Sequence, residues 1–462
     1  MTIWIPDLDR SKPLYLAIAD SIGHAVASGA LSKGQRLPPQ RDLAWKLGVT
    51  LGTVTRAYRQ AELRGLLSGE VGRGSFIRTD STAVVTAMAE RGDEICDLSQ
   101  ASPPPMASAA ELDAALNHVM HDPNRLALMD YTASEGLPAH RAMMVQWLKR
   151  SGIEAQEKDI FVTPGAHSAL ATTLDALQEQ QATILAEDIN YAHLNQLFRR
   201  AKLETLALPM DENGLLPDAL EAAAIKNKAR LLYLVPTLQN PTTHTMSRQR
   251  REDIVAIARK HDLTIIEDDI FRLLDERVQP PTFYSLAPER TYHISSLSKT
   301  LAPGLRIGFV LTPQGQDRLM RAHVRSMAPR TSALTGEVAR FWIEGDLAST
   351  ILARTQAELG RRRQGFLEIF KDCRFSCAPG APYAWMEVPE PWTGSKFAGA
   401  ALAQNIKISP GSIFELGPKG KARHHVRICF GAPGSLGQSL KAFESLRALM
   451  DNPPEDDFTP VA

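Results

Sequence analysis

The chain has 462 residues, 44% hydrophobic and 23% charged, a composition typical of a soluble globular protein with two or three domains. Its formal net charge is zero, but residues 1–79 hold eleven basic against six acidic side chains, which favours a polyanionic partner for that region. Cys96, Cys373, Cys377 and Cys429 are too irregularly spaced for a disulfide framework or metal site, and no signal peptide or long apolar run occurs, so we expect a cytoplasmic protein with no membrane span.

The first 79 residues have the pattern of three short helices and a hairpin. Residues 13–29 predict a helix because apolar side chains recur every four residues on one face. Two more helices are predicted over 39–47 and 50–63, with a tight turn at Gly48 and with Thr50 as an N-cap. The following stretch, LLSGEVGRGSFIRT, predicts two short strands around a glycine-rich turn.

Residues 80–93 have no strong period and are interpreted as a linker to a second domain spanning 94–450. In that domain, strand-like apolar runs alternate with amphipathic helical stretches, which predicts a mostly parallel sheet with helices on both faces. The runs are 159–165, 182–188, 229–236, 263–269, 291–298 and 306–312. A smaller C-terminal α+β subdomain with strands at 382–388 and 425–430 precedes a flexible tail at 451–462.

Residues 36–77, RLPPQRDLAWKLGVTLGTVTRAYRQAELRGLLSGEVGRGSFI, resemble the GntR superfamily of regulators. The shared features are a Leu-Pro pair, an Arg that opens the second helix, a Gly-Val-Thr turn and a Gly-Arg-Gly wing. The resemblance implies a winged helix-turn-helix that binds a double-stranded DNA operator. Its small core would contain Leu43, Leu47, Val49, Val54, Ala57 and Leu63.

The candidate DNA contacts of this module lie on and around the third helix. They are Thr50, Thr53, Arg56 and Arg59 on its outward face, and Arg41 and Arg73 on the flanks, where they would reach phosphate or the minor groove. Each arginine taken alone is better explained as a solvated surface charge, whereas the set around a helix-turn-helix favours DNA contact. Many relatives carry Arg after the turn Thr, but this chain has Leu51 and Gly52 there, which leaves the base readout open.

The string SSLSKTLAPGLRIGF, residues 295–309, follows an apolar strand and resembles the Schiff-base motif of fold-type-I aminotransferases. The resemblance implies that Lys299 holds pyridoxal phosphate (PLP) as an internal aldimine and that Ser296 and Arg306 bind its phosphate. In TPGAHSAL, the backbone amides of Ala166 and His167 would cradle the same phosphate at a helix N-terminus. A lone Ser-x-x-Lys could belong to a surface lysine, but the longer string favours the cofactor.

Groups for the cofactor ring follow in the order that this family has. Tyr191 resembles the aromatic residue that stacks on the ring, with a core tyrosine as the alternative. Asn240 in QNPT resembles the residue that hydrogen-bonds the ring 3-oxygen, although Asn-Pro is also ordinary turn chemistry. Asp268 would pair with the pyridine nitrogen; Asp269 is the alternative, and Glu267 is less favoured.

Further positions bear on the ligand and the assembly. Arg427 in HVRICF resembles the arginine that grips an α-carboxylate, although a strand arginine is often a surface ion-pair partner. Tyr131 resembles the tyrosine donated to the partner's phosphate across a dimer interface, and residues 99–104 resemble the N-terminal loop that lies over the substrate. Phe271 stands where the family often has a Tyr that hydrogen-bonds the ring oxygen, so we expect PLP to bind but proton transfer to be weakened.

Together these features resemble the MocR subfamily of GntR regulators over about residues 10–450. The resemblance implies a head-to-tail homodimer with a ligand-responsive, aminotransferase-like domain. The favoured hypothesis is a DNA-binding transcriptional regulator that senses PLP or a small amino compound through an aldimine at Lys299. Two alternatives stay open: an active aminotransferase with an accessory DNA-binding domain, and a DNA-binding scaffold whose large domain only dimerises.

Overall fold

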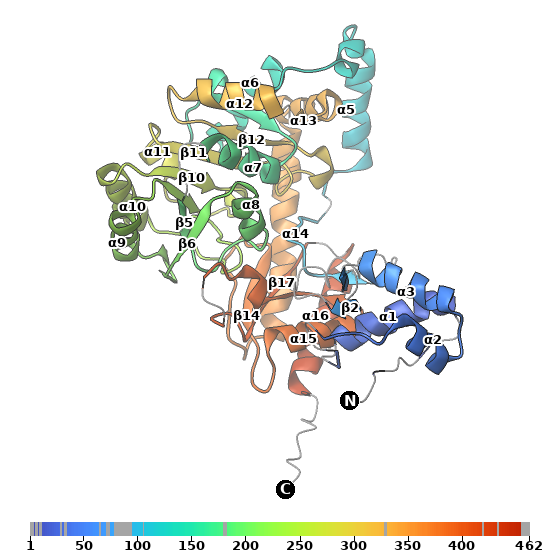
Figure 1. Cartoon of the computed structure of the whole chain (residues 1–462). Helices are drawn as coiled ribbons and strands as arrows, with labels where there is room; N and C mark the ends of the chain where they lie inside the picture. The colour runs from blue at the N-terminus through green and yellow to red at the C-terminus, as the bar shows by residue number, and fades with distance from the viewer. Residues whose placement is uncertain are drawn as a thin grey trace. The chain divides into compact units, whose positions relative to one another are not determined.

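The computed structural model describes residues 4, 8, 12–27, 30–31, 35–63, 66–70, 74–77, 95–104, 106–178, 183–327, 330–417, 420–431 and 434–453 (Figure 1). The chain forms two compact units, which are described separately. One contains residues 1–96 and 395–407, and the other contains residues 97–394 and 408–462. The expectations for the linker, for Arg73 and for nearly all of the tail concern residues outside the described ranges.

Within the first unit, residues 14–77 contain three helices and a hairpin. They are α1 (Leu14–Ala27), α2 (Gln40–Leu47), α3 (Leu51–Leu63), β1 (Leu67–Glu70) and β2 (Gly74–Ile77). The two strands pair antiparallel. This order of elements confirms the predicted winged helix-turn-helix.

Two turn residues and one apolar core explain the local fold of this unit. Gly48 ends α2 with φ of 65°, in the left-handed region that favours glycine. Thr50 Oγ1 accepts a hydrogen bond of 3.2 Å from the Thr53 amide and so caps α3. Buried side chains from the three helices meet in one core that includes Ile18, Ile22, Leu43, Val54, Ala57 and Tyr58, with Leu47 and Val49 partly buried beside it.

The second unit is centred on a mixed seven-stranded sheet. Its strands are β4 (Ile160–Thr163), β5 (Thr183–Glu187), β6 (Glu204–Leu208), β9 (Leu231–Leu234), β10 (Thr264–Asp268), β11 (Thr291–Ser296) and β12 (Gly308–Leu311). Their spatial order is β4-β12-β11-β10-β9-β5-β6, and only β12 runs against its neighbours. The predicted, mostly parallel sheet is therefore confirmed.

Helices pack on both faces of this sheet because side chains of successive strand residues point to opposite faces. One core joins the sheet to α7 (Ala166–Leu177), α8 (Leu194–Arg200) and α12 (Asp317–Met327). The other core joins it to α9 (Pro217–Asn227), α10 (Arg248–Lys260) and α11 (Phe283–Leu286) (Figure 1). On β10, Ile266 belongs to the first core and Ile265 to the second.

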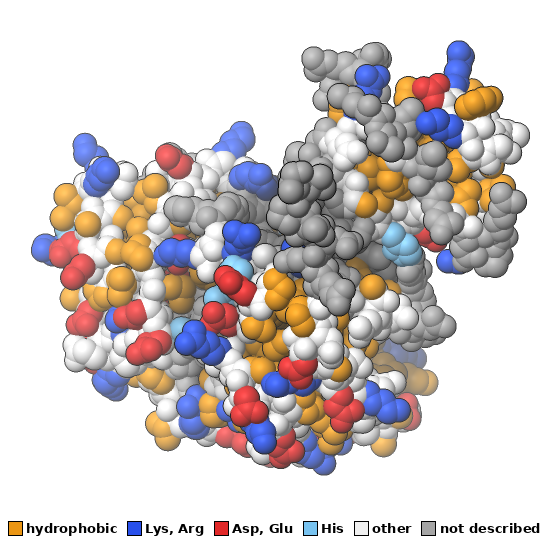
Figure 2. Space-filling model, turned by 90° about the horizontal axis from the view of Figure 1, so that it is seen from below, with side chains coloured by type: hydrophobic (Ala, Val, Ile, Leu, Met, Phe, Trp, Pro, Cys, Tyr) orange, Lys and Arg blue, Asp and Glu red, His pale blue; other side chains and the backbone are white. Residues whose placement is uncertain are grey.

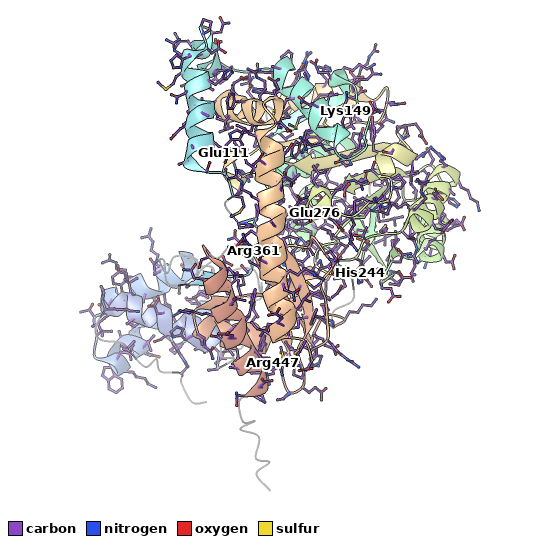
Figure 3. All side chains as sticks on the ribbon, turned by 180° about the vertical axis from the view of Figure 1, so that it is seen from behind. Glu111, Lys149, His244, Glu276, Arg361 and Arg447 are labelled. Carbon is purple, nitrogen blue, oxygen red and sulfur yellow. The ribbon has the colours of Figure 1, made fainter. Side chains whose placement is uncertain are left out.

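A long helix, α14 (Leu347–Ile369), leads to the C-terminal part of this unit. It follows α6 (Pro138–Lys149) and α13 (Ala333–Glu344) in the chain. Arg354 on α14 forms an ion pair with Glu111 on α5 (Ala109–His121). Figure 3 shows Glu111 beside one end of α14, Arg361 midway along it and Arg447 near its other end.

The C-terminal part is a four-stranded antiparallel sheet with a helix packed against α14. The sheet has the order β13-β14-β17-β16, from β13 (Phe375–Ser376), β14 (Tyr383–Glu387), β17 (His425–Cys429) and β16 (Ser409–Pro410), and the helix is α16 (Leu436–Asp451). The two predicted strands at 382–388 and 425–430 are thus confirmed as β14 and β17.

Short elements complete the described chain. They are β3 (Cys96–Asp97), β7 (Met210–Asp211), β8 (Gly214–Leu215), α15 (Gly394–Ala403), β15 (Ile406–Lys407) and 3-10 turns at Arg125–Met129, Glu157–Asp159, Arg272–Leu274, Pro303–Leu305 and Gly411–Phe414. Among the helices that the structure describes, none is long and apolar enough to cross a membrane. On the face shown in Figure 2, acidic and basic side chains are interspersed with apolar ones.

Candidate functional site

Lys299 lies in the turn after β11, at the carboxyl end of a parallel strand. Its Nζ donates a hydrogen bond of 2.6 Å to the carbonyl oxygen of Ala101. Burial, followed by the positive charge of Arg427, lowers the pKa of Lys299 to about 8. An amine with a pKa of about 8 is roughly one-tenth neutral at pH 7, and the neutral form is the one that attacks an aldehyde.

Asp268 is buried at the end of β10, the strand next to β11. Its Oδ2 accepts a hydrogen bond of 2.8 Å from the Tyr233 hydroxyl, whereas its Oδ1 has no hydrogen-bond partner. Burial raises the pKa of Asp268 to about 6. A buried carboxylate oxygen without a donor fits a cationic N–H, such as that of a protonated pyridine ring.

The two neighbours of Asp268 on the chain point to the opposite face of the sheet. Glu267 accepts a hydrogen bond of 2.8 Å from the backbone amide of Phe283 on α11. Asp269 lies 3.7 Å from the Arg272 guanidinium. Both carboxylates therefore lie on the far face, which leaves Asp268 as the candidate for the ring nitrogen.

Glu267, Asp269 and His293 bring their possible ligand atoms within 4.8 Å of one another, close enough to consider a metal ion. Arg251 lies 3.9 Å from Glu267, and Arg272 lies against Asp269, so two guanidinium groups balance the two carboxylates. A divalent cation would add two charges to a buried cluster that is already balanced. The group is better explained as a buried ion-pair network.

The N-terminus of α7 offers an anion-binding end. Gly165 precedes it with φ of 93°, and a Cβ at that position would lie 2.9 Å from Nη2 of Arg306. The same Nη2 donates a hydrogen bond of 3.1 Å to the carbonyl oxygen of Pro164, so the guanidinium lies against the turn. The backbone amides of Ala166 and His167 begin the helix. Amides, helix dipole and guanidinium together fit a phosphate dianion.

Two serines of the SSLSK string are candidates for the same phosphate. Ser296 ends β11 and is buried, in register with Gly308 on β12. Ser298 is also buried, and its Oγ has no hydrogen-bond partner. The sequence prediction named Ser296 and missed Ser298. An unsatisfied buried hydroxyl next to Lys299 in the chain makes Ser298 a further candidate.

Tyr191 follows β5 and lies close to both the phosphate end and Asp268. Its ring makes edge contacts with His167 and His193, at centroid distances of 6.5 and 5.3 Å. Burial, and then the negative charge of Asp268, raise the pKa of the Tyr191 hydroxyl to about 12. This position agrees with a role beside the cofactor ring, which stays a prediction.

Arg427 on β17 is buried and already holds two acceptors. Its Nη1 donates to Oδ1 of Asn240 at 2.6 Å, and its Nη2 donates to the carbonyl oxygen of Ser99 at 2.5 Å. The guanidinium lies 4.8 Å from the ring centre of Phe414 and 5.4 Å from that of Tyr383, and its Nε has no partner. A buried guanidinium between aromatic rings, with an N–H that has no partner, can bind a ligand carboxylate.

The Phe271 side chain has no polar atom. The ring is buried and makes an edge contact with Tyr383 at 5.5 Å. The Tyr383 hydroxyl donates to the carbonyl oxygen of Leu238 at 2.7 Å, so that hydroxyl is engaged with the backbone. Phe271 therefore supplies packing to this pocket and no hydrogen-bond donor.

Tyr131 lies on the surface of the second unit. Its side chain is 87% exposed, and the Arg330 guanidinium lies 4.9 Å from its ring centre. An exposed tyrosine can contribute to the site of a second copy, as the sequence predicted, and this role stays a prediction.

In the first unit, the described candidates for DNA contact lie on the surface. Arg41, Thr50, Arg56 and Arg59 are exposed and Thr53 is half-buried. Arg56 also places its guanidinium 4.0 Å from the ring centre of Tyr15 on α1, which orients it. Trp45 on α2 is 83% exposed, and the sequence prediction missed it because an amphipathic pattern does not reveal an unpaired aromatic.

Comparison with known proteins gives a family match for each of the two predicted domains. Residues 94–446 match the family described as aminotransferase class I and II, and residues 14–77 match bacterial regulatory proteins of the gntR family. The chain belongs to the class I and II aminotransferase family. With its GntR module it has the domain combination of the MocR subfamily.

Relatives of this aminotransferase-family chain include regulators. It is 26% identical over 450 residues to the uncharacterized HTH-type transcriptional regulator YdeF of Bacillus subtilis, covering 97% of each chain. It is 28% identical over 363 residues to the HTH-type pyridoxine biosynthesis transcriptional regulator PdxR of Corynebacterium glutamicum, covering 74% and 75%. Its fold matches LysN of Thermus thermophilus, solved with N-(5'-phosphopyridoxyl)-L-leucine, with TM-score 0.69, 23% identity and coverage of 78% and 92%.

The residues of this aminotransferase domain fit PLP. Asp268 offers an unpaired oxygen for the ring nitrogen, and Lys299 offers an amine of lowered pKa for the aldehyde. Arg306 and the N-terminus of α7 offer charge and amides for the phosphate. All of these groups belong to the second unit.

Proposed function

We propose that this MocR-type chain is a DNA-binding transcriptional regulator whose aminotransferase domain senses PLP or a small amino compound. The observation that carries the proposal is a set of groups that fit PLP around Lys299, on the same chain as a GntR module. The names of the relatives YdeF and PdxR support regulation, and that of PdxR supports a link to vitamin B6. The DNA partner is an operator in the bacterial cytoplasm.

The pocket fits an effector with a primary amine and a carboxylate. When bound, PLP supplies an aldehyde that bonds to amines and a ring that withdraws electrons. Lys299 provides the point of attachment, and Asp268 holds the proton of the ring nitrogen. Arg427 takes the carboxylate of the effector. An amino acid or a related amino compound meets all of these requirements.

A working aminotransferase is the second candidate function, and the complete set of groups around Lys299 favours it. Phe271 favours sensing over turnover because it gives no hydrogen bond to the ring oxygen. Conversion of an amino donor and a keto acid, measured against a Lys299→Ala control, distinguishes the two. Sustained turnover that depends on Lys299 would favour the enzyme.

We further propose a head-to-tail homodimer that buries the surface around Tyr131. Large apolar side chains are exposed in this stretch of the chain: Leu112, Leu116, Met120, Leu126 and Met129. The first three recur every four residues and so share one face of α5. Exposed apolar side chains at this density are typical of an interface. Sedimentation of a Leu116→Asp, Met129→Asp double variant should show monomers where the parent chain shows dimers.

The decisive experiment follows DNA binding and cofactor in one titration. Fluorescence anisotropy of the DNA fragment upstream of the chain's own gene is measured with and without PLP, and then with a panel of amino acids. The proposal expects a ligand-dependent change in affinity that the Lys299→Ala variant loses. An unchanged response in that variant would remove Lys299 from the mechanism.

A further inference from the structure

Leu51 is the first residue of α3, the second helix of the helix-turn-helix, and its side chain is 43% exposed. By contrast, Val54, Ala57 and Tyr58 of the same helix are buried in the core of the unit. Single exposed leucines are common on protein surfaces, so exposure by itself indicates no function. What distinguishes Leu51 is its place on the helix and the polar groups beside it.

The N-terminal end of the second helix is the part of a helix-turn-helix that contacts base edges in the major groove. Leu51 occupies the first position of this helix, after Thr50, which caps it. Because residues four apart share one face of a helix, Leu51 lies in one row with Thr55 and Arg59. Arg59 is exposed and is itself a candidate DNA contact. Leu51 therefore lies on the face of α3 that carries the proposed DNA contacts.

The threonine hydroxyls near Leu51 make hydrogen bonds inside the unit. Those of Thr50 and Thr53 hydrogen-bond to each other at 2.9 Å. The Thr55 hydroxyl donates to Oε1 of Gln40 on α2 at 2.8 Å. Two of the three hydroxyl hydrogens are thus used within the protein, which leaves one of them and the Leu51 side chain to face a ligand. A base edge that meets this end of α3 therefore meets chiefly an apolar group.

Gly52, the next residue of α3, leaves the space beside Leu51 open. It is exposed, and among the described residues a Cβ at this position would meet only Oγ1 of Thr50, at 3.8 Å. That distance is an ordinary contact, so packing within the unit does not require a glycine here. Glycine is also less favourable than alanine within a helix. The missing side chain allows the leucine to approach a base edge without obstruction from its neighbour.

We propose that Leu51 contacts the 5-methyl group of a thymine in the major groove and so selects an A·T base pair in the site of each DNA-binding unit. This inference rests on the proposed function. The thymine methyl is the apolar group that base pairs present in the major groove, and apolar side chains recognise it. The other groups on the base edges are hydrogen-bond donors and acceptors, to which a leucine side chain offers no partner.

A methyl contact differs from the charged contacts that the same module offers. Arg41, Arg56 and Arg59 are exposed and supply positive charge for the phosphates. Attraction to phosphates acts on every sequence and weakens as salt is added. A contact made by the uncharged Leu51 acts on one base pair and releases no counterion. The two kinds of contact are therefore separable by their responses to salt and to sequence.

The test replaces thymine by deoxyuridine, which removes the 5-methyl group and keeps the pairing with adenine. The DNA fragment upstream of the chain's own gene is first shortened to the smallest duplex that keeps full affinity, and its thymines are then replaced singly. We expect one thymine in the site of each DNA-binding unit to cost about 4-fold in affinity by anisotropy, the factor for one methylene-sized group. Replacement of both should cost the product, about 16-fold.

Leu51→Ala, titrated with the same duplexes, assigns the methyl effect to this side chain. In this variant the loss on the doubly replaced duplex should fall to about 2-fold or less, the usual scatter of such cycles. The slope of its log affinity against log salt should equal that of the parent chain, because no charge is removed. Leu14→Ala is the matched control: Leu14 is the first residue of α1, is 37% exposed, and its loss should leave the methyl effect at the parent value.

These outcomes separate the methyl contact from the proposed function. A thymine whose methyl matters to the parent chain and not to Leu51→Ala supports the contact. Equal losses in the two proteins, or no thymine at which the methyl matters, would overturn it, while salt-dependent and PLP-dependent DNA binding by the parent chain would leave regulation standing. If the parent chain binds the fragment no better than unrelated DNA, the proposed function fails and the methyl contact fails with it.

Discussion

The Tyr233 hydroxyl donates a hydrogen bond of 2.8 Å to Oδ2 of Asp268 and leaves Oδ1 of the same carboxylate without a partner. One oxygen thus fixes the side chain, and the other is available to a bound ring. The hydroxyl also favours the ionised carboxylate, against the burial that raises the pKa of Asp268 to about 6. The pair leaves one unpartnered carboxylate oxygen at the carboxyl end of β10.

Asp268→Asn should weaken PLP binding. It replaces a charged acceptor of the ring N–H, and such hydrogen bonds are worth about 1.5–3 kcal/mol, so we expect a loss of about 10-fold or more in affinity. Absorbance titration with PLP measures it. Tyr233→Phe is the control, because it removes the orienting hydroxyl and keeps the carboxylate, and its effect should be smaller. Parent-like affinity of Asp268→Asn would exclude this residue as the ring partner.

The rate at which Lys299 captures PLP should increase with pH from 6 and level off above about 8. Only the neutral amine attacks the aldehyde, and burial lowers the pKa of this lysine to about 8 from the usual value near 10.5. Stopped-flow absorbance of the protein mixed with PLP gives the profile, with Lys299→Ala as the blank. A rate still rising steeply between pH 9 and 10 would contradict the lowered pKa.

Much of this site was predictable because its motifs are local. The Schiff-base string, the QNPT turn and the strand-end Asp268 each follow a strand that the apolar pattern reveals. Their meeting at one edge follows from parallel strands whose carboxyl ends align. Asp268 was preferred over Asp269 from a motif alone, and the structure gives the reason in the alternation of side chains across β10.

Other features could not be predicted, because they depend on contacts between distant segments. The Ser99 and Arg427 pair joins residues 328 positions apart, and no pattern in either stretch indicates it. The buried, unpartnered hydroxyl of Ser298 depends on packing around it. The orientation of Arg56 by Tyr15 likewise needs α1 and α3 to be placed together.

Phe271→Tyr should strengthen proton transfer on the cofactor. The added hydroxyl restores a hydrogen bond to the ring oxygen that the family often has, and such a hydrogen bond is worth about 0.5–1.5 kcal/mol, or roughly 2- to 12-fold in rate. We expect the single-turnover half-reaction with an amino acid to become at least several-fold faster, measured from the change in cofactor absorbance. Phe271→Leu removes the ring and adds no donor, so it should not accelerate the reaction.

Arg59→Ala should weaken DNA binding at every sequence. Its exposed guanidinium on α3 is a candidate phosphate contact, and loss of one such contact lowers the slope of log affinity against log salt by about one. Anisotropy titrations at several salt concentrations measure both effects. Arg248→Ala removes an exposed arginine from α10 of the other unit and is the charge control. An unchanged salt slope in Arg59→Ala would place Arg59 outside the DNA contact.

Glu187→Gln should gain stability relative to the parent chain as the pH rises from 5 to 8. Glu187 is fully buried at the end of β5, where Oε2 accepts from Asn190 at 3.1 Å and from Gln239 at 3.3 Å, and Oε1 has no partner. Burial raises the pKa of Glu187 to about 8. The folded chain therefore holds a proton here that the unfolded chain releases above its ordinary value near 4.5.

The sign of the effect follows from proton linkage. A folded pKa above the unfolded one gives stability that is fully present below about pH 4.5 and is lost as the pH rises to about 8, at up to about 1.4 kcal/mol per unit. Glutamine accepts the same two hydrogen bonds and does not titrate. Urea unfolding at pH 5, 6, 7 and 8 should thus show a widening gap in favour of Glu187→Gln. Glu276→Gln, at an exposed position (Figure 3), is the control and should show a constant difference. A constant difference for Glu187→Gln as well would mean that Glu187 is ionised in the folded chain.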